Sequence, residues 1–203
     1  WLEQRGDLVE LDEILGYHLE QAAHYKHELG QPDPALAERA GERLATAGRI
    51  ALWRGDERAA AGLLERALVL TRPTRLDVVL ELNLANAILA QDGARAVAIA
   101  DAVAERARAA GDRTGELVAR LGAAGLRVRG SGWSGSDPSL DELEQLARGA
   151  LPRLEQEGDH AHLAIVWGVR IMVPYLRNRF EDVAVAAERS VAHARLAGWH
   201  ESA

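Results

Sequence analysis

Gly48-Arg-Ile-Ala-Leu-Trp-Arg-Gly-Asp56 is the stretch that decides the fold, together with Ala60, Leu64, Ala67, Leu68 and Pro73 downstream of it. Apolar and small residues recur here at spacings of three and four, which is the period of an amphipathic helix. Gly55 and Asp56 interrupt this pattern, because glycine tolerates a left-handed turn and a carboxylate caps the N–H groups of a following helix. The stretch therefore predicts two helices joined by a tight turn.

The composition of the whole chain also favours helices. Its 203 residues include 38 alanines and 29 leucines, both strong helix formers, but only one Phe and three Tyr. No segment alternates between apolar and polar residues for long enough to make a convincing strand. We therefore predict an all-α fold.

Glycine and aspartate mark further helix boundaries. Gly30 closes a first helix, and Asp33-Pro34 opens the next as an N-cap followed by proline at the first helical position. The pairing of glycine with aspartate recurs at Gly111-Asp112 and Gly158-Asp159. Each pair predicts the end of one helix and the start of another.

Prolines make two further predictions in the second half of the chain. A helix is expected to open at Asp137-Pro138, or at Ser139 with Glu142 completing a capping box. Pro174 is expected to kink a helix over residues 160–176, because proline lacks the N–H that the preceding turn requires.

An internal repeat follows from the same stretch. Gln91-Asp92 repeats the turn 36 residues after Gly55-Asp56, and small residues recur at Ala96 and Ala100. The pattern resembles the tetratricopeptide repeat (TPR), whose period is about 34 residues. The resemblance implies units that start near residues 41, 77, 115 and 164, with Gly48 and Gly122 where two helices cross. It also implies a right-handed superhelical stack of antiparallel helix pairs, a TPR-like α-solenoid.

The resemblance divides the chain at residue 33. Residues 1–33 are expected to form an N-terminal linker helix region, and residues 34–203 the repeat array. Residues 130–139 are rich in Gly and Ser, which predicts a flexible loop inside the third unit. Trp133 in this loop either folds back onto the helices or serves as an exposed aromatic anchor for a partner.

The N-terminal part carries a second resemblance. Trp-Leu-Glu-Gln-Arg at residues 1–5 and Leu-Gly-Tyr-His-Leu-Glu-Gln-Ala at residues 15–22 resemble the junction region of large bacterial STAND or AAA-type signalling ATPases, as do His24-Tyr25 and Glu28-Leu29-Gly30. In that family an ATPase module precedes a helical repeat array, and many members carry a cyclase-homology domain or a LuxR-type helix-turn-helix. The chain begins with Trp rather than Met, so we expect it to be part of such a longer, cytoplasmic protein.

Several classes of function are disfavoured. The net charge of −7 argues against direct binding of nucleic acid, which needs a basic surface. No apolar run reaches the ~18 residues of a membrane-spanning helix. Motifs for phosphate-binding loops, zinc helices and nucleophile elbows do not occur, and there is no cysteine. We therefore predict neither an enzyme nor a cofactor.

The TPR resemblance also implies which residues face a partner. On the concave wall these are Glu42, Arg49, Trp53, Glu81 and Arg127, and Tyr175 is expected to face the same groove. The arginines would bind carboxylates and Trp53 would anchor a partner, or else Trp53 is buried against the next unit.

Three residues of the first helix are possible metal ligands. His24, His27 and Glu28 share one side of the first helix. No second cluster in the sequence completes a site, so we interpret them as a solvated face and predict no metal.

The leading hypothesis is a non-enzymatic scaffold for contacts with a protein or with another domain of its own chain. The alternative is a small-ligand sensor whose concave groove binds a metabolite. A homodimer through the exposed end of the array is also expected, because residues 182–198 form an apolar helix with no successor to cover it.

Overall fold

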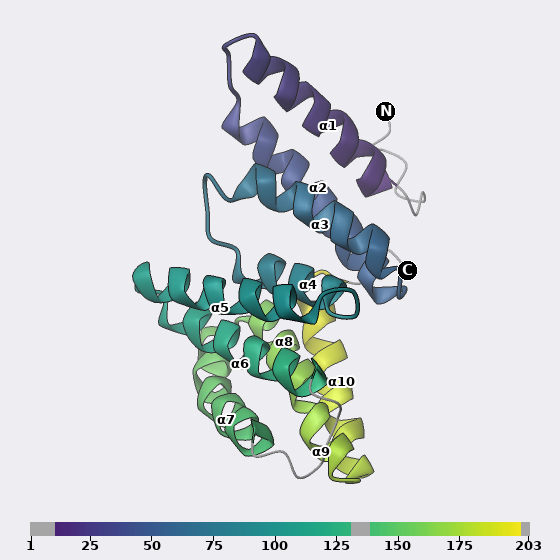
Figure 1. Cartoon of the computed structure of the whole chain (residues 1–203), viewed down its shortest axis with the longest axis vertical. Coiled ribbons are helices and arrows are strands. Elements are labelled where there is room, and N and C mark those ends of the chain that lie inside the picture. The colour runs from purple at the N-terminus through teal and green to yellow at the C-terminus, as the bar shows by residue number, and fades with distance from the viewer. Residues whose placement is uncertain (1–10, 131–138, 200–203) are drawn as a thin grey trace. The chain divides into compact units, whose positions relative to one another are not determined.

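A computed structural model describes residues 11–130 and 139–199 of the chain. These residues form α-helices joined by short turns, with no strand among them (Figure 1). The prediction of an all-α fold is confirmed.

The chain divides between Ala87 and Ile88 into two compact units. The first unit contains α1 (Leu11–Glu28), α2 (Pro34–Trp53), α3 (Glu57–Thr71) and nearly all of α4 (Val78–Ile88). The second contains α5 (Gly93–Ala109), α6 (Arg113–Gly130), α7 (Ser139–Glu157), α8 (His160–Arg170), α9 (Met172–Leu176) and α10 (Phe180–Leu196). α1, which contains most of the region expected to be an N-terminal linker, belongs to the same unit as α2.

The predicted helix boundaries are confirmed where glycine and aspartate mark them. Asp33 accepts a hydrogen bond from the Leu36 N–H at 3.0 Å, with Pro34 as the first residue of α2. Gly55, Gly111 and Gly158 have φ angles of 78°, 74° and 66°, and the aspartate after each of them caps the next helix. These boundaries depend on neighbouring residues alone, which is why the sequence predicts them well.

The predicted disturbance at Pro174 is also present. α8 ends at Arg170 and α9 begins at Met172, so the expected helix is interrupted one turn before the proline. Pro174 has no N–H to donate to the carbonyl of Arg170, which removes the hydrogen bond that would carry the helix through this point.

Close packing of helices in the first unit depends on glycine. α2 packs against both α1 and α3 (Figure 1). A Cβ atom on Gly48 would lie 2.7 Å from Leu64 Cγ on α3, and one on Gly16 would lie 2.9 Å from Leu44 Cγ on α2. Gly48 therefore lies at a close crossing of α2 and α3, as the repeat pattern predicts, and α1 packs closely on α2 at Gly16.

The second unit is built from successive contacts between neighbouring helices. α5 packs on α6, α6 on α7 and α8, α7 on α8, and α8 on α10. Gly125 of α6 allows a close approach, since a Cβ there would lie 3.0 Å from Met172 Cε. The Ser190 hydroxyl ties α10 to α8 by donating to the Ala164 carbonyl at 3.0 Å.

Candidate functional site

Four of the residues predicted to face a partner are exposed. Trp53 is 64% exposed and Tyr175 is 50% exposed, so both present large apolar surfaces. Glu42 and Arg127 are exposed as well, with ion pairs from Arg127 to Asp101 at 2.6 Å and from Glu42 to Arg75 at 3.5 Å.

Two of the predicted residues are placed differently. Glu81 is only 1% exposed, and its carboxylate accepts two hydrogen bonds from the guanidinium of Arg72, at 3.0 and 2.7 Å. Arg49 is largely desolvated, which lowers its pKa, and it donates to Thr46 Oγ1 at 3.0 Å. Neither side chain is presented on the surface as an open partner for a ligand.

The remaining candidates were Trp133 and the histidines of α1. Trp133 lies outside the described residues. His24 Nε2 lies 3.1 Å from Glu28 Oε1, and both side chains are more than half exposed. Within residues 11–130 and 139–199, no group of three or more His, Asp or Glu side chains is arranged to hold a metal ion.

The first unit contains an open hollow of about 950 Å³, which we call the α1–α3 groove. It lies between the C-terminal halves of α1 and α3 and the start of α2. Its apolar lining is Ala23, Pro32, Pro34, Ala37, Val69, Leu70 and Pro73, and its polar lining is Glu20, Gln21, His24, His27, Asp33 and Thr74. Val69 is 70% exposed, so an apolar wall faces solvent.

The acidic residues of this groove are neutralised by basic neighbours. Lys26 Nζ lies 2.7 Å from Asp33 Oδ2 and lowers the pKa of that carboxyl. Arg66 of α3 donates from Nε to both carboxylate oxygens of Glu20 on α1, at 3.2 and 3.1 Å. The groove therefore offers apolar surface with little net charge.

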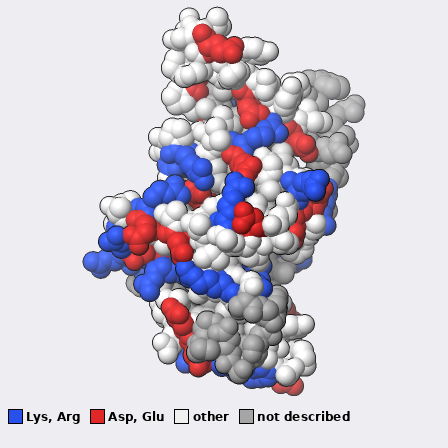
Figure 2. Space-filling view, viewed as in Figure 1, with Lys and Arg blue, Asp and Glu red and all other residues white. Residues whose placement is uncertain are grey.

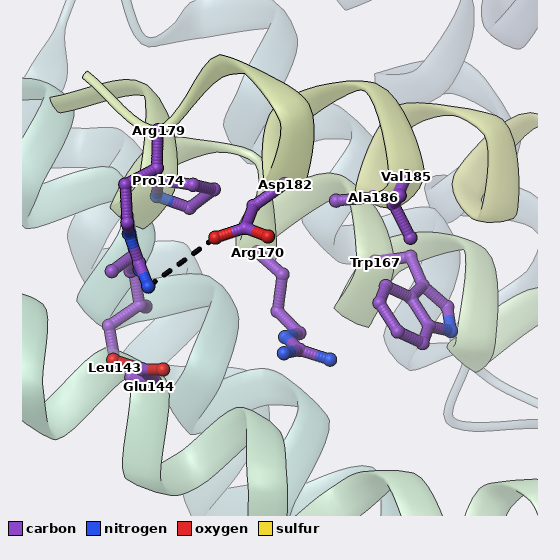
Figure 3. Close-up of a pocket in the computed structure, with 10 residues that line it drawn as sticks. Leu143, Glu144, Trp167, Arg170, Pro174, Arg179, Asp182, Val185 and Ala186 are labelled. Atoms are coloured by element: carbon purple, nitrogen blue, oxygen red, sulfur yellow. Dashed lines mark ion pairs between the residues drawn. The ribbon is translucent and has the colours of Figure 1, made fainter. Parts of the chain in front are cut away.

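The second unit contains a smaller hollow of about 210 Å³ between α7, α8, α9 and α10, which we call the Trp167 cleft. Its apolar wall consists of Leu143, Trp167, Val173, Pro174, Val185 and Ala186. Its polar lining is Glu144, Arg170, Arg179 and Asp182. Figure 3 shows the Arg170 side chain between Glu144 and Trp167, with the Asp182 carboxylate beside it and an ion pair from Asp182 to Arg179.

Neither hollow was predicted from the sequence, although the sequence contains one signal for the cleft. Trp167 and Arg170 are three residues apart, so they share one face of α8. The Arg170 Cζ atom indeed lies 4.5 Å from the centre of the Trp167 ring. The α1–α3 groove has no such local signal, because its walls come from three separate helices.

A histidine pair joins α8 to α10 near one end of each helix. His160 Nδ1 and His193 Nδ1 are 3.1 Å apart, so one ring must donate and the other accept. Burial lowers the pKa of His193, and the charges of His160 and Arg189 lower it further, whereas Glu155 acts in the opposite sense. The contact therefore requires at least one neutral histidine.

We expect this pair to make stability depend on pH. His193 titrates near 6.5 when unfolded and below that when folded, so unfolding takes up a proton as the pH falls. The melting temperature should be constant above about pH 6.5 and should decrease from there towards pH 5. Scanning calorimetry of the protein and of His193→Gln checks this, because the variant should show a shallower decrease. Superimposable pH profiles would show that the pair has no such effect.

Charge and hydropathy place further limits on the site. Acidic and basic side chains are interleaved on the face that Figure 2 shows. None of the helices described here combines the length and the apolar composition needed to cross a lipid bilayer.

Comparison of the chain with models of protein families, with curated protein sequences and with solved structures finds no match.

Proposed function

We propose that this chain is a non-enzymatic helical-repeat module that binds a polypeptide segment, either of another protein or of its own longer parent. The α1–α3 groove is the surface that would receive the segment. Nucleic acid and membranes are not among the proposed partners.

The observation that carries this proposal is the open, apolar wall of the groove. Small-molecule sites are usually concave and bury most of the ligand surface. Here the wall residue Val69 is 70% exposed, and the hollow of about 950 Å³ is open rather than enclosed. An open wall of this kind suits several apolar side chains of an extended partner better than one enclosed metabolite.

The helix contacts support a TPR-like stack as the finer description of the fold. In such a stack, the first helix of a pair packs on its own second helix and on the second helix of the preceding pair. α2 has this relation to α3 and α1, and α8 has it to α10 and α7. In the proposed solenoid these contacts repeat along a right-handed superhelix.

The resemblance of the N-terminal part suggests the biological setting. In this proposal the module is the regulatory arm of a cytoplasmic STAND or AAA-type signalling ATPase. The bound segment would then belong to another domain of the same regulator or to a protein that it controls.

Selection of random displayed peptides on the protein tests the groove directly. We expect the retained peptides to carry apolar side chains, because the groove is apolar with neutralised charges. Val69→Asp places a charge on its exposed wall and should abolish retention. Ala102→Asp on an exposed position of α5 is the matched control and should leave retention unchanged. Equal retention by both variants would refute the proposed role of the groove.

We also expect the isolated chain to self-associate through α10. Val185 and Leu196 on this helix are 52% and 65% exposed, and an exposed apolar surface favours association. Light scattering over a concentration series should show a rising mean mass, and Leu196→Glu should suppress the rise. A strictly monomeric protein at high concentration would contradict this expectation.

A further inference from the structure

The Trp167 cleft shares no lining residue with the α1–α3 groove, and charged side chains make up more of its lining. Two carboxylates, of Glu144 and Asp182, lie on its rim together with the guanidinium groups of Arg170 and Arg179. The question is which of these charges remains available to a ligand.

The two carboxylates already have basic partners. Glu144 pairs with Arg148 at 2.8 Å and with Arg177 at 3.3 Å, and Asp182 pairs with Arg179 at 3.4 Å (Figure 3). Both rim acids are thus engaged by arginines other than Arg170.

Arg170 differs from the other charged residues of the cleft in its contacts. It forms no hydrogen bond or ion pair with any residue in the described part of the chain, and its guanidinium contacts the Trp167 ring instead. Partial burial lowers its pKa by removing water from the charged group, whereas the negative charges of Glu144 and Asp182 act in the opposite sense. Arg189 adds a second positive charge, with its Cζ atom 5.1 Å from the same ring. The cleft therefore contains a guanidinium group that no carboxylate of the described residues holds by a hydrogen bond or an ion pair.

We propose that the Trp167 cleft binds a carboxylate that carries a small apolar group. The planar guanidinium of Arg170 would hold the carboxylate in a two-pronged hydrogen-bonded pair. The apolar group would lie against Val173, Val185 and the Trp167 ring.

Size and charge determine this class of ligand. The hollow of about 210 Å³ lies below the range of about 300–1,000 Å³ typical of drug-sized ligands, so it suits a small molecule or the end of a chain. A doubly charged phosphate would approach the carboxylates of Glu144 and Asp182 and would find no apolar group to place against the wall. A monocarboxylate with a branched tail matches both the charge and the lining.

Two sources could supply such a carboxylate. One is a free small acid, and the other is the C-terminal carboxylate of a polypeptide that ends in an apolar residue. The site chemistry is the same for both, so the source is a question for separate arms of the experiment. Neither depends on the α1–α3 groove.

The test uses 3-methylbutanoate as the probe and follows the indole N–H signals by NMR during titration. We expect the Trp167 signal, assigned with Trp167→Phe, to shift with saturation while the Trp53 signal stays constant. The neutral 3-methylbutanamide and inorganic phosphate should cause no shift of the Trp167 signal. Equal shifts with the amide, or with phosphate, would overturn the proposed carboxylate site.

Variants separate the guanidinium from general effects of folding. Arg170→Gln should weaken binding at least tenfold, as expected for the loss of charge-assisted hydrogen bonds. Arg170→Lys keeps the charge but loses the planar guanidinium. Its affinity for 3-methylbutanoate should lie between those of the unsubstituted protein and of Arg170→Gln. Arg153→Gln, on the exposed side of α7, is the matched control and should leave the Kd unchanged. Unchanged binding in a folded Arg170→Gln protein would refute the assignment.

The final arm distinguishes the two sources. A peptide Gly-Ser-Ala-Leu with a free C-terminus is compared with its C-terminal amide. Binding of the free peptide alone, tighter than 3-methylbutanoate, identifies a polypeptide terminus as the ligand. Binding of 3-methylbutanoate but of neither peptide identifies a free small acid, and binding of neither probe refutes the site.

Discussion

Replacing Arg72 by Gln should lower the free energy of unfolding by about 3 kcal/mol, the largest effect that we expect from a single substitution in this chain. Glu81 is 1% exposed, and the two hydrogen bonds from Arg72 compensate its negative charge. Removing the guanidinium leaves a buried carboxylate with less compensation. The expected loss lies at the lower end of the range for buried pairs because the Arg72 side chain is 45% exposed. Urea denaturation measures it.

A second substitution separates the ion pair from packing. In a Glu81→Gln background no carboxylate is buried, so Arg72→Gln should cost about 1 kcal/mol or less. Arg58→Gln, at an exposed position of the same helix α3, should change stability by less than about 0.5 kcal/mol. Equal losses for Arg72→Gln in both backgrounds would show that the pair contributes nothing specific.

Replacing Gly48 by Val should lower the free energy of unfolding by about 1–3 kcal/mol. A Cβ at this position would lie 2.7 Å from Leu64 Cγ and 3.4 Å from Leu63 Cβ, and Val adds two further carbon atoms. α2 and α3 must then separate, which weakens the packing of the first unit. Urea denaturation, with circular dichroism as the readout, detects the change.

Gly62 provides the matched control on α3. A Cβ added there meets no atom within 4 Å, so Gly62→Ala brings only the higher helix propensity of alanine. It should raise the free energy of unfolding by about 1 kcal/mol. If Gly48→Val were as stable as the unsubstituted protein, the two helices would not cross closely at this glycine.

The parts of the fold that the sequence predicts are those that depend on nearby residues. Helix ends at Gly55 and Gly158 follow from a glycine and the aspartate after it, since both the left-handed turn and the cap form within a few residues. The interruption before Pro174 is equally local, because the missing N–H affects only the preceding turn. The crossing at Gly48 was predicted from a repeated pattern and is satisfied by contact with Leu64.

The candidate sites could not be predicted in the same way, because they depend on contacts between distant segments. The position of Glu81 in the repeat predicted that its side chain lies on the exposed concave wall. That position gives no sign that the Arg72 guanidinium reaches the Glu81 carboxylate. The α1–α3 groove needs Ala23, Pro34 and Val69 from three helices, whose relative placement no spacing in the sequence reveals. The same holds for Arg170, because the availability of its guanidinium to a ligand depends on which arginines pair with Glu144 and Asp182.

The most direct test of the α1–α3 groove is photo-crosslinking in the native host, with the protein carrying benzoylphenylalanine in place of Val69. We expect one reproducible polypeptide adduct from this position, mapping to the same segment in independent experiments, and no such adduct when the photoreactive residue replaces Ala102. The synthetic segment should then bind the purified protein and lose affinity in Val69→Asp. Absence of an adduct at position 69, or the same adducts at positions 69 and 102, would contradict the claim that the α1–α3 groove receives a polypeptide.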